Sequence, residues 1–141
     1  MPDFAARVKG LFEAGRHKTI ATVRADGSPR ISGIEAGFED GELTFGSMVP
    51  ARKVDDLRRN PRFHLHGPTF HPVEGKEAEW PGEAKIAGTA VPGDAPEGVE
   101  DAAGFTADIH EVTVTCLDPT ASRLVVEWWT PSRGLQRIER E

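Results

Sequence analysis

The sequence has one cysteine, no tyrosine and no long hydrophobic run among its 141 residues. The single cysteine, Cys116, excludes a disulfide within the chain and disfavours a cysteine-based metal site. Without tyrosine, the chain has no phenolic group that could donate a proton. The longest apolar stretches, such as residues 124–126, are far shorter than the roughly 20 residues that a membrane-spanning helix needs.

Positive charge is also scarce, since 17 Lys and Arg face 23 Asp and Glu and give a net charge of −6. An acidic domain disfavours general binding to nucleic acid. Residues 1–18 carry charges throughout and lack the apolar segment of a signal peptide. We therefore expect a cytoplasmic protein with neither a membrane nor a nucleic acid as its partner. The excess of Arg over Lys favours a GC-rich bacterial source.

Length and a hydrophobic content of 38% fit one globular domain over residues 1–141. The spacing of apolar residues predicts an N-terminal helix over residues 3–15, capped by Asp3. Strand patterns joined by Asp-Gly turns predict a three-stranded meander over residues 18–47, and Pro50 opens a second short helix. Further strands are expected at residues 62–66, 84–91, 109–117 and 123–129.

These elements predict a mainly β fold, in which six or seven antiparallel strands and two short helices make a small β-barrel. The barrel is expected over about residues 18–130. A C-terminal tail follows over residues 131–141, in which residues 135–138 could extend the last strand.

The densest charge cluster places five of the 17 basic residues within eleven positions. Arg52 and Lys53 fall in the first turn of the second predicted helix, where the helix dipole disfavours cations unless an anion compensates. A phosphate there would be held by free backbone N–H groups and by both side chains. Arg58 and Arg59 fall in the last turn, where cations are favoured. Asp55 can pair with either, so these two are expected to form a solvated face.

The second strand of the meander, which starts at Pro29, is a further candidate. Alternation places Arg30 and Ser32 on one face of this strand and Ile31 and Gly33 on the other. A glycine in the middle of a strand marks either curvature of the sheet or the close approach of a ligand.

Gly46, Ser47 and Met48 join the third strand to the second helix. Their small and hydroxyl side chains would allow a ligand close to the backbone. A plain strand-to-helix connection is the alternative interpretation.

Near the C-terminus, Trp128 and Trp129 must face opposite sides of one strand. One is expected to fill the core, and the other to contact a subunit or a planar ligand. Arg133 follows and could bind an anion, or it could belong to a solvated tail. His64 and His66 share a strand face, but no nearby carboxylate completes a recognisable ligand pattern, so no metal site is predicted.

Four segments, in order, resemble the family of pyridoxamine 5′-phosphate oxidase-like split-barrel proteins. Residues 19–32 are a strand pair with DGxP at the turn, and residues 51–62 resemble the family's RK…NL…(D/N)PR segment. Residues 88–90 resemble its GxA strand, and residues 127–135 resemble the Trp-rich C-terminus of some bacterial members. The match covers roughly residues 15–138.

The resemblance implies a six-stranded antiparallel split barrel of the FMN-binding type that works as a homodimer. Family members bind FMN or the deazaflavin F420 at the subunit interface, and a few bind haem. The Arg-Lys pair after the third strand holds the cofactor phosphate, strand residues border the flavin, and a C-terminal Trp or Arg of the partner subunit often completes the site. By this resemblance the cofactor-binding residues are Arg30, Ile31, Ser32, Gly33, Gly46, Ser47, Met48, Arg52, Lys53, Trp129 and Arg133.

Two departures bear on the expected reaction. The chain lacks the C-terminal substrate-phosphate signature of the vitamin B6 enzymes, and Glu35 stands where many members have an apolar residue. We therefore expect an FMN-dependent oxidoreductase for another small molecule, with no catalytic side chain identified. FMN is favoured because the anionic tail of F420 would benefit from more basic groove residues. The alternatives are an F420-dependent reductase, a non-enzymatic flavin- or haem-binding protein that uses a histidine as haem ligand, and a dimer whose cofactor site has decayed.

Overall fold

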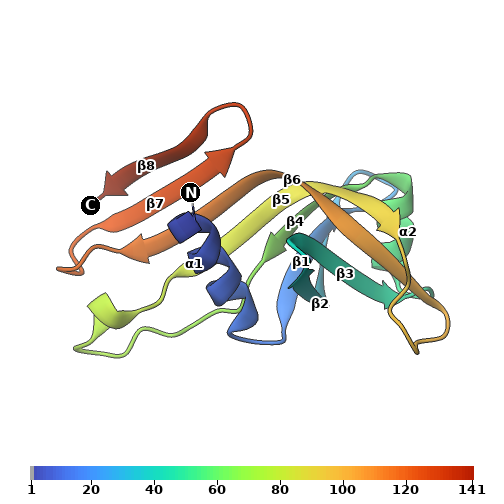
Figure 1. The fold of residues 1–141 in the computed structure, drawn as a ribbon, viewed down its shortest axis with the longest axis horizontal. Coiled ribbons are helices and arrows are strands. Elements are labelled where there is room, and N and C mark those ends of the chain that lie inside the picture. The colour runs from blue at the N-terminus through green and yellow to red at the C-terminus, as the bar shows by residue number, and fades with distance from the viewer. Residues whose placement is uncertain (1) are drawn as a thin grey trace.

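The protein is described by a computed structural model that covers residues 2–141 and contains two helices and eight strands. Figure 1 shows their arrangement in space. Among these residues, no helix combines the length and the apolar character needed to cross a membrane. The elements, in chain order, are α1 (Pro2–Glu13), β1 (Lys18–Val23), β2 (Pro29–Glu39), β3 (Glu42–Met48), α2 (Arg52–Arg59), β4 (Arg62–His66), a 3₁₀ turn (Glu77–Glu79), β5 (Glu83–Gly93), β6 (Ala102–Leu117), β7 (Leu124–Thr130) and β8 (Gly134–Arg140).

Six of the strands close into a barrel. The sheet order is β3-β2-β1-β4-β5-β6, and a further antiparallel pairing of β3 with β6 joins its two ends. The predicted six-stranded antiparallel barrel is therefore confirmed. Strands β7 and β8 continue the sheet beyond β6, on the side away from α2 (Figure 1).

Strand β6 serves both parts of the sheet because it is 16 residues long. Residues 102–106 pair with β3 and residues 112–117 pair with β7. The crossing with β3 brings two backbones together at Gly46 and Gly104. A Cβ at Gly104 would overlap the carbonyl oxygen of Asp94, which follows β5, so the close approach of the β5–β6 connection requires a glycine at this point of β6.

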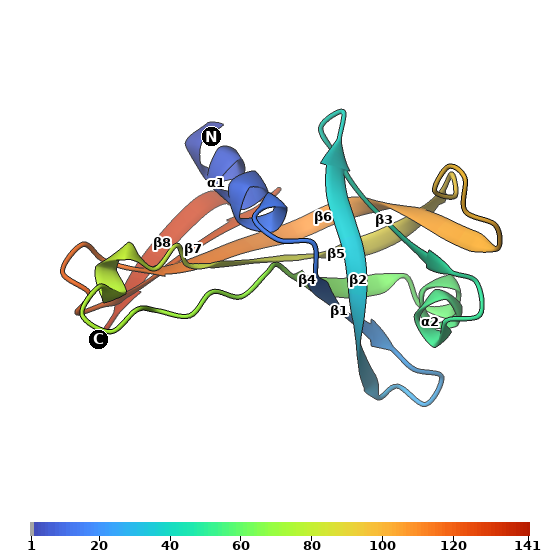
Figure 2. The same cartoon turned by 90° about the horizontal axis from the view of Figure 1, so that it is seen from below.

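Both Asp-Gly turns of the predicted meander are present, and they set its register. Gly27 has a φ of 87°, and the pair Asp40 and Gly41 has φ values of 51° and 81°. Two successive positive φ values are those of a type I′ turn, whose twist matches that of the flanking strands. Figure 2 shows the β2–β3 hairpin projecting from the barrel with this turn at its tip.

Three expectations need correction. The strand predicted at residues 109–117 is only the second half of β6. The sequence does not predict the first half, because the small side chains at residues 102–104 lack the bulk typical of strands. The barrel closes at β6, so β7 lies outside it. Most of the predicted tail over residues 131–141 is β8, an edge strand that is largely exposed on both faces and so shows no clear alternation.

Helix α1 covers one face of the sheet, as its apolar spacing predicts. Phe4, Val8 and Phe12 are all buried. The ring of Phe12 meets Phe38 of β2 edge-on, with 6.1 Å between the centroids. The helix begins at Pro2, so Asp3 lies inside its first turn rather than at the predicted cap.

The core predicts a sharp contrast between two valine-to-alanine substitutions. Val114 of β6 is 1% exposed, whereas Val73, in the connection between β4 and β5, is 61% exposed. We expect Val114→Ala to lower the free energy of unfolding by about 1.5–3 kcal/mol, the value of a buried side chain of this size. Val73→Ala should change it by less than about 0.5 kcal/mol. Chemical denaturation measures both, and equal losses would contradict the assigned core.

Candidate functional site

Helix α2 follows β3 after a short connection, and its N-terminus carries two cations. Ala51 at the N-cap is extended and makes no side-chain capping hydrogen bond. Arg52 is exposed and Lys53 is half-buried. Within the described chain, residues 2–141, neither side chain forms an ion pair. The first turn of α2 therefore combines an N-terminus that no side chain caps with two cations that form no ion pair, and it also contains the exposed Asp55.

The next turn of α2 holds a buried carboxylate that ties the helix to the barrel. Asp56 is 2% exposed. Its Oδ2 accepts hydrogen bonds from Thr22 Oγ1 of β1 at 2.8 Å and from Arg30 Nε of β2 at 2.7 Å. Its Oδ1 accepts one from Arg59 Nη2 at 3.0 Å. Asp56, and not the exposed Asp55, is thus the partner of Arg59.

Two opposing effects act on the pKa of Asp56. Burial raises it, because removal from water disfavours the charged form. Hydrogen bonds from Arg30, Thr22 and Arg59 together outweigh burial and hold the pKa below its ordinary value. The carboxylate is therefore ionised at neutral pH and is fully engaged by these three donors.

The predicted residues of β2 lie on two faces, as alternation indicates. Arg30 and Ser32 are half-buried, and Arg30 is engaged by Asp56. Ile31 and Gly33 lie on the outer face, where Ile31 is 74% exposed and a Cβ at Gly33 would meet open space. The Arg30 face is thus joined directly to α2, and the outer face is free to meet a ligand or another chain.

The segment from Gly46 to Met48 leads directly into α2. Backbone hydrogen bonds fix it, because Ala51 donates to the carbonyl of Met48 at 3.0 Å and Val49 donates to that of Asp101 at 2.6 Å. A Cβ at Gly46 would lie 2.9 Å from the Pro96 ring, so packing already accounts for this glycine. Met48 is exposed and Ser47 is half-buried.

Trp129 and Arg133, the two C-terminal candidates, do not lie beside the predicted residues at the start of α2 within one chain. Trp129 packs against the core and, with Phe4, Val8 and Phe38, lines an apolar pocket of about 380 Å³ beside α1. Arg133 is exposed in the turn between β7 and β8. Both lie in the part of the sheet that extends away from α2 (Figure 1).

The two histidines of β4 have different surroundings, and His66 contacts Gly67 and Glu83. His66 Nδ1 donates to the carbonyl of Gly67 at 2.6 Å, and its Nε2 lies 3.3 Å from Glu83 Oε2. Burial, together with the charge of Lys85, lowers the pKa of His64. Across residues 2–141, no three His, Cys, Asp or Glu side chains group as metal ligands would.

The sequence matches the family model described as pyridoxamine 5′-phosphate oxidase over residues 4–125. The chain belongs to the pyridoxamine 5′-phosphate oxidase family. The match spans all six barrel strands and α2, so the predicted family resemblance is confirmed. Comparison of the sequence with curated proteins gives no match.

Solved structures show the same fold at low sequence identity. A pyridoxamine 5′-phosphate oxidase-related, FMN-binding protein from Nostoc punctiforme has a TM-score of 0.67 at 10% identity, covering 99% of this chain and 96% of that one. PhzG from Burkholderia lata, in complex with tetrahydrophenazine-1-carboxylic acid, has a TM-score of 0.66 at 12% identity, covering 99% and 87%. An F420 reductase has a TM-score of 0.56 at 14% identity, covering 74% and 94%.

The Asp56 network predicts a pH-dependent contribution to stability. A carboxylate whose pKa is lowered by folding stabilises the protein above its unfolded pKa, here about 3.8, and the contribution is lost as the pH falls through the folded value. We expect Asp56→Asn to lower the free energy of unfolding by about 1–3 kcal/mol at pH 7.

This difference from the native protein should shrink below pH 4. Denaturant titrations between pH 7 and pH 3 measure it. Asp55→Asn, at the exposed neighbouring position, is the matched control and should change stability by less than about 0.5 kcal/mol. If Asp56→Asn lowers the free energy of unfolding by the same amount at every pH, the charge of Asp56 does not contribute to stability.

Proposed function

We propose that the protein is a flavin-binding oxidoreductase that uses FMN to oxidise or reduce a small organic molecule. The observation that carries the proposal is the first turn of α2, where an uncapped helix N-terminus and the cations of Arg52 and Lys53 have no partner in the described chain. Membership of the family and the FMN-binding relative from Nostoc punctiforme support it.

The charges of α2 explain why an anion is needed. Cations at a helix N-terminus are disfavoured by the helix dipole. Asp56, one turn further along, cannot offset them because Arg30, Arg59 and Thr22 already occupy its oxygens. A phosphate group would accept hydrogen bonds from the free backbone N–H groups and from both side chains at once.

Two further predicted residues, Ile31 and Gly33, fit the rest of such a cofactor. The outer face of β2 around Ile31 and Gly33 is open and can lie along a planar ring. FMN supplies hydride chemistry when it is bound, and the chain's part is to hold its phosphate, orient its ring and exclude water. No acid or base of this chain is assigned to the reaction.

FMN is preferred to F420 on charge. F420 carries a long anionic tail, and the chain's net charge of −6 leaves few basic residues beyond α2 to receive it. The FMN-binding relative also covers nearly the whole chain, whereas the F420 reductase covers 74% of it. An F420-dependent reductase is the second candidate, supported by that relative.

We also propose that the working form is a homodimer with the cofactor at its interface. Trp129 belongs to β7 and Arg133 to the turn between β7 and β8, and these two strands extend away from α2 of their own chain. They can therefore contribute to a site at α2 only from a partner subunit. Exposed Ile31 and Met48 supply apolar surface near α2 for such an interface.

The direct experiment is a parallel titration of the purified protein with FMN, F420 and haem, followed by absorbance. Saturable micromolar binding of FMN is expected. Preference for F420 would select the second candidate. A haem Soret band without flavin binding would move attention to the histidines, and no binding at all would contradict a cofactor role.

Lys53→Ala tests the phosphate contact. Loss of one charge-assisted hydrogen bond should weaken FMN binding by about 1–3 kcal/mol, roughly 5- to 150-fold in Kd. Lys76→Ala, in the exposed connection before β5, is the control and should leave the affinity unchanged. If both variants bind FMN like the native protein, Lys53 is not part of the site.

A further inference from the structure

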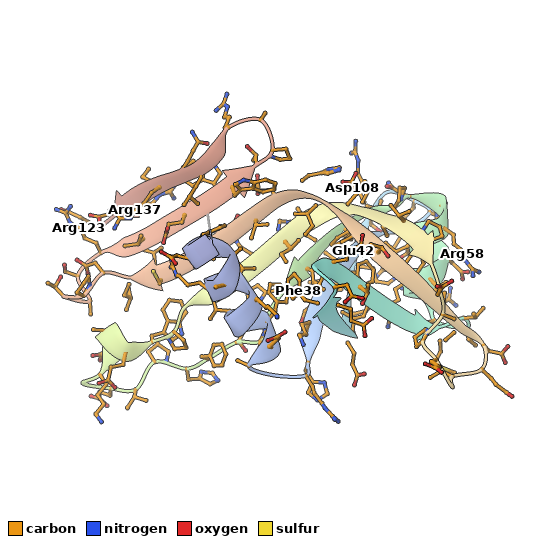
Figure 3. The ribbon with its side chains drawn as sticks, in the orientation of Figure 1. Phe38, Glu42, Arg58, Asp108, Arg123 and Arg137 are labelled. Atoms are coloured by element: carbon orange, nitrogen blue, oxygen red, sulfur yellow. The ribbon has the colours of Figure 1, made fainter. Side chains whose placement is uncertain are left out.

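The apolar pocket beside α1 has a floor that three neighbouring strands share. Ile86 of β5, Val112 of β6 and Trp129 of β7 pair in a single row across the sheet, and all three line the pocket. Phe38 of β2 adds a side wall and lies beside α1 (Figure 3). The opposite side is formed by residues of α1, which are Phe4, Ala5 and Val8. The volume of about 380 Å³ is within the range of pockets that hold small organic ligands.

A β-bulge in β6 turns one more apolar side chain towards this pocket. His110 is an extra residue of β6, because the register against β5 shifts between Ala87 and Gly88. In an unbroken strand, residues 109 and 112 would face opposite sides of the sheet. Because of the extra residue, Ile109 and Val112 both line the pocket. Bulges are common next to functional sites, where they redirect a side chain in this way.

Contacts on two sides hold α1 over the sheet. Arg7 Nη1 lies 2.8 Å from Glu127 Oε1 of β7, and the ring of Phe12 meets that of Phe38 of β2. The helix is thus attached to the two strands that supply Trp129 and Phe38 to the pocket. Arg7 and Glu127 pair with each other, so neither of them offers an unpaired charge to a ligand.

The chemistry of the lining determines which ligand fits. All eight lining residues are apolar. A carboxylate or an ammonium would give up its hydration there without gaining a partner. Water is held poorly for the same reason, and an apolar ligand gains affinity by displacing such water. Phe4, Phe38 and Trp129 are aromatic, and aromatic rings pack favourably edge-to-face or offset against one another.

We propose that this pocket binds a compact, uncharged aromatic molecule. A volume of 380 Å³ corresponds to a cube with a side of about 7 Å, less than the roughly 10 Å thickness of a helix or a packed sheet of a protein partner. The site does not rest on the proposed cofactor function. Phe38 lies on the opposite face of β2 from Ile31 and Gly33, and Trp129 alone among the predicted cofactor residues lines the pocket.

The first test uses N-phenyl-1-naphthylamine, an uncharged probe whose fluorescence rises in apolar surroundings. Saturable binding at one site per chain is expected. The probe is then displaced with 2-naphthol or 2-naphthoate, which share a ring system and differ in charge at pH 7. We expect 2-naphthol to act at a concentration at least about tenfold lower, because the carboxylate would lose its water without a partner. Absence of saturable binding, or equal displacement by the two compounds, would overturn the proposal.

Two neighbouring alanines of α1 give a matched pair of variants. Ala5 and Ala6 are both exposed, but only Ala5 lines the pocket. Ala5→Phe fills part of the ligand's volume and should weaken binding of the naphthylamine probe at least about tenfold. Ala6→Phe should bind it like the native protein, and circular dichroism verifies that both variants are folded. Native affinity in a folded Ala5→Phe variant would contradict the assigned site.

A measurement on the native protein locates the ligand without any substitution. Nuclear Overhauser effects between 2-naphthol and protein methyl groups are expected at Ile86, Ile109 and Val112. Effects at the exposed Ile31 instead would place the ligand on the opposite face of the sheet and overturn the assignment. Sedimentation with and without the naphthylamine probe tests whether a second copy of the chain is the occupant. Dissociation of an oligomer by the probe would contradict a small-molecule site.

One further titration separates this pocket from the cofactor site. The affinity for 2-naphthol is measured by calorimetry with and without saturating FMN. Unchanged affinity supports two separate sites. Competition between the two ligands would show that the pocket is part of the cofactor cleft and would overturn the assignment of a separate site. Failure of FMN to bind leaves the probe experiments unaffected.

Discussion

The position of α2 depends on one buried carboxylate. Asp56 accepts hydrogen bonds from β1, from β2 and from its own helix, so it joins three elements at one point. An ionised carboxylate away from water is tolerated only when such donors surround it. Because Arg59 is engaged there, the cations of α2 that form no ion pair within residues 2–141 are Arg52 and Lys53 at its start and Arg58 at its end. The same interaction that fixes the helix thus leaves its N-terminus positively charged.

The chain distributes its few basic residues unevenly, and the candidate site at α2 depends on this. At the start of α2, Arg52 is exposed and Lys53 is half-buried, and neither forms an ion pair within residues 2–141, which suits a phosphate. The exposed arginine Arg58, at the other end of α2, lies outside this candidate site (Figure 3).

Much of this architecture is readable from the sequence, for physical reasons. The apolar spacing of α1, the two Asp-Gly turns and the alternation of β1 to β5 are local signals, and each predicted element is present. The role of Asp56 is not local, since its partners lie 26 and 34 residues away and Asp55 is an equally plausible partner for Arg59 on sequence alone. The sequence does not predict the first half of β6, and it predicts β8 only in part, as an extension of the preceding strand over residues 135–138. The conformation of both segments comes from pairing rather than from their own side chains.

The length of β6 has a consequence for solubility. If the chain stopped at the end of this strand, the pairing groups now used by β7 would form an open edge, flanked by the apolar residues Val112 and Val114. Open edges of this kind invite pairing with other copies and aggregation. The C-terminal hairpin moves the edge of the sheet to β8, where Arg137, Glu139 and Arg140 are exposed. Charged side chains along an edge strand oppose such pairing, so the last strand protects the sheet that it completes.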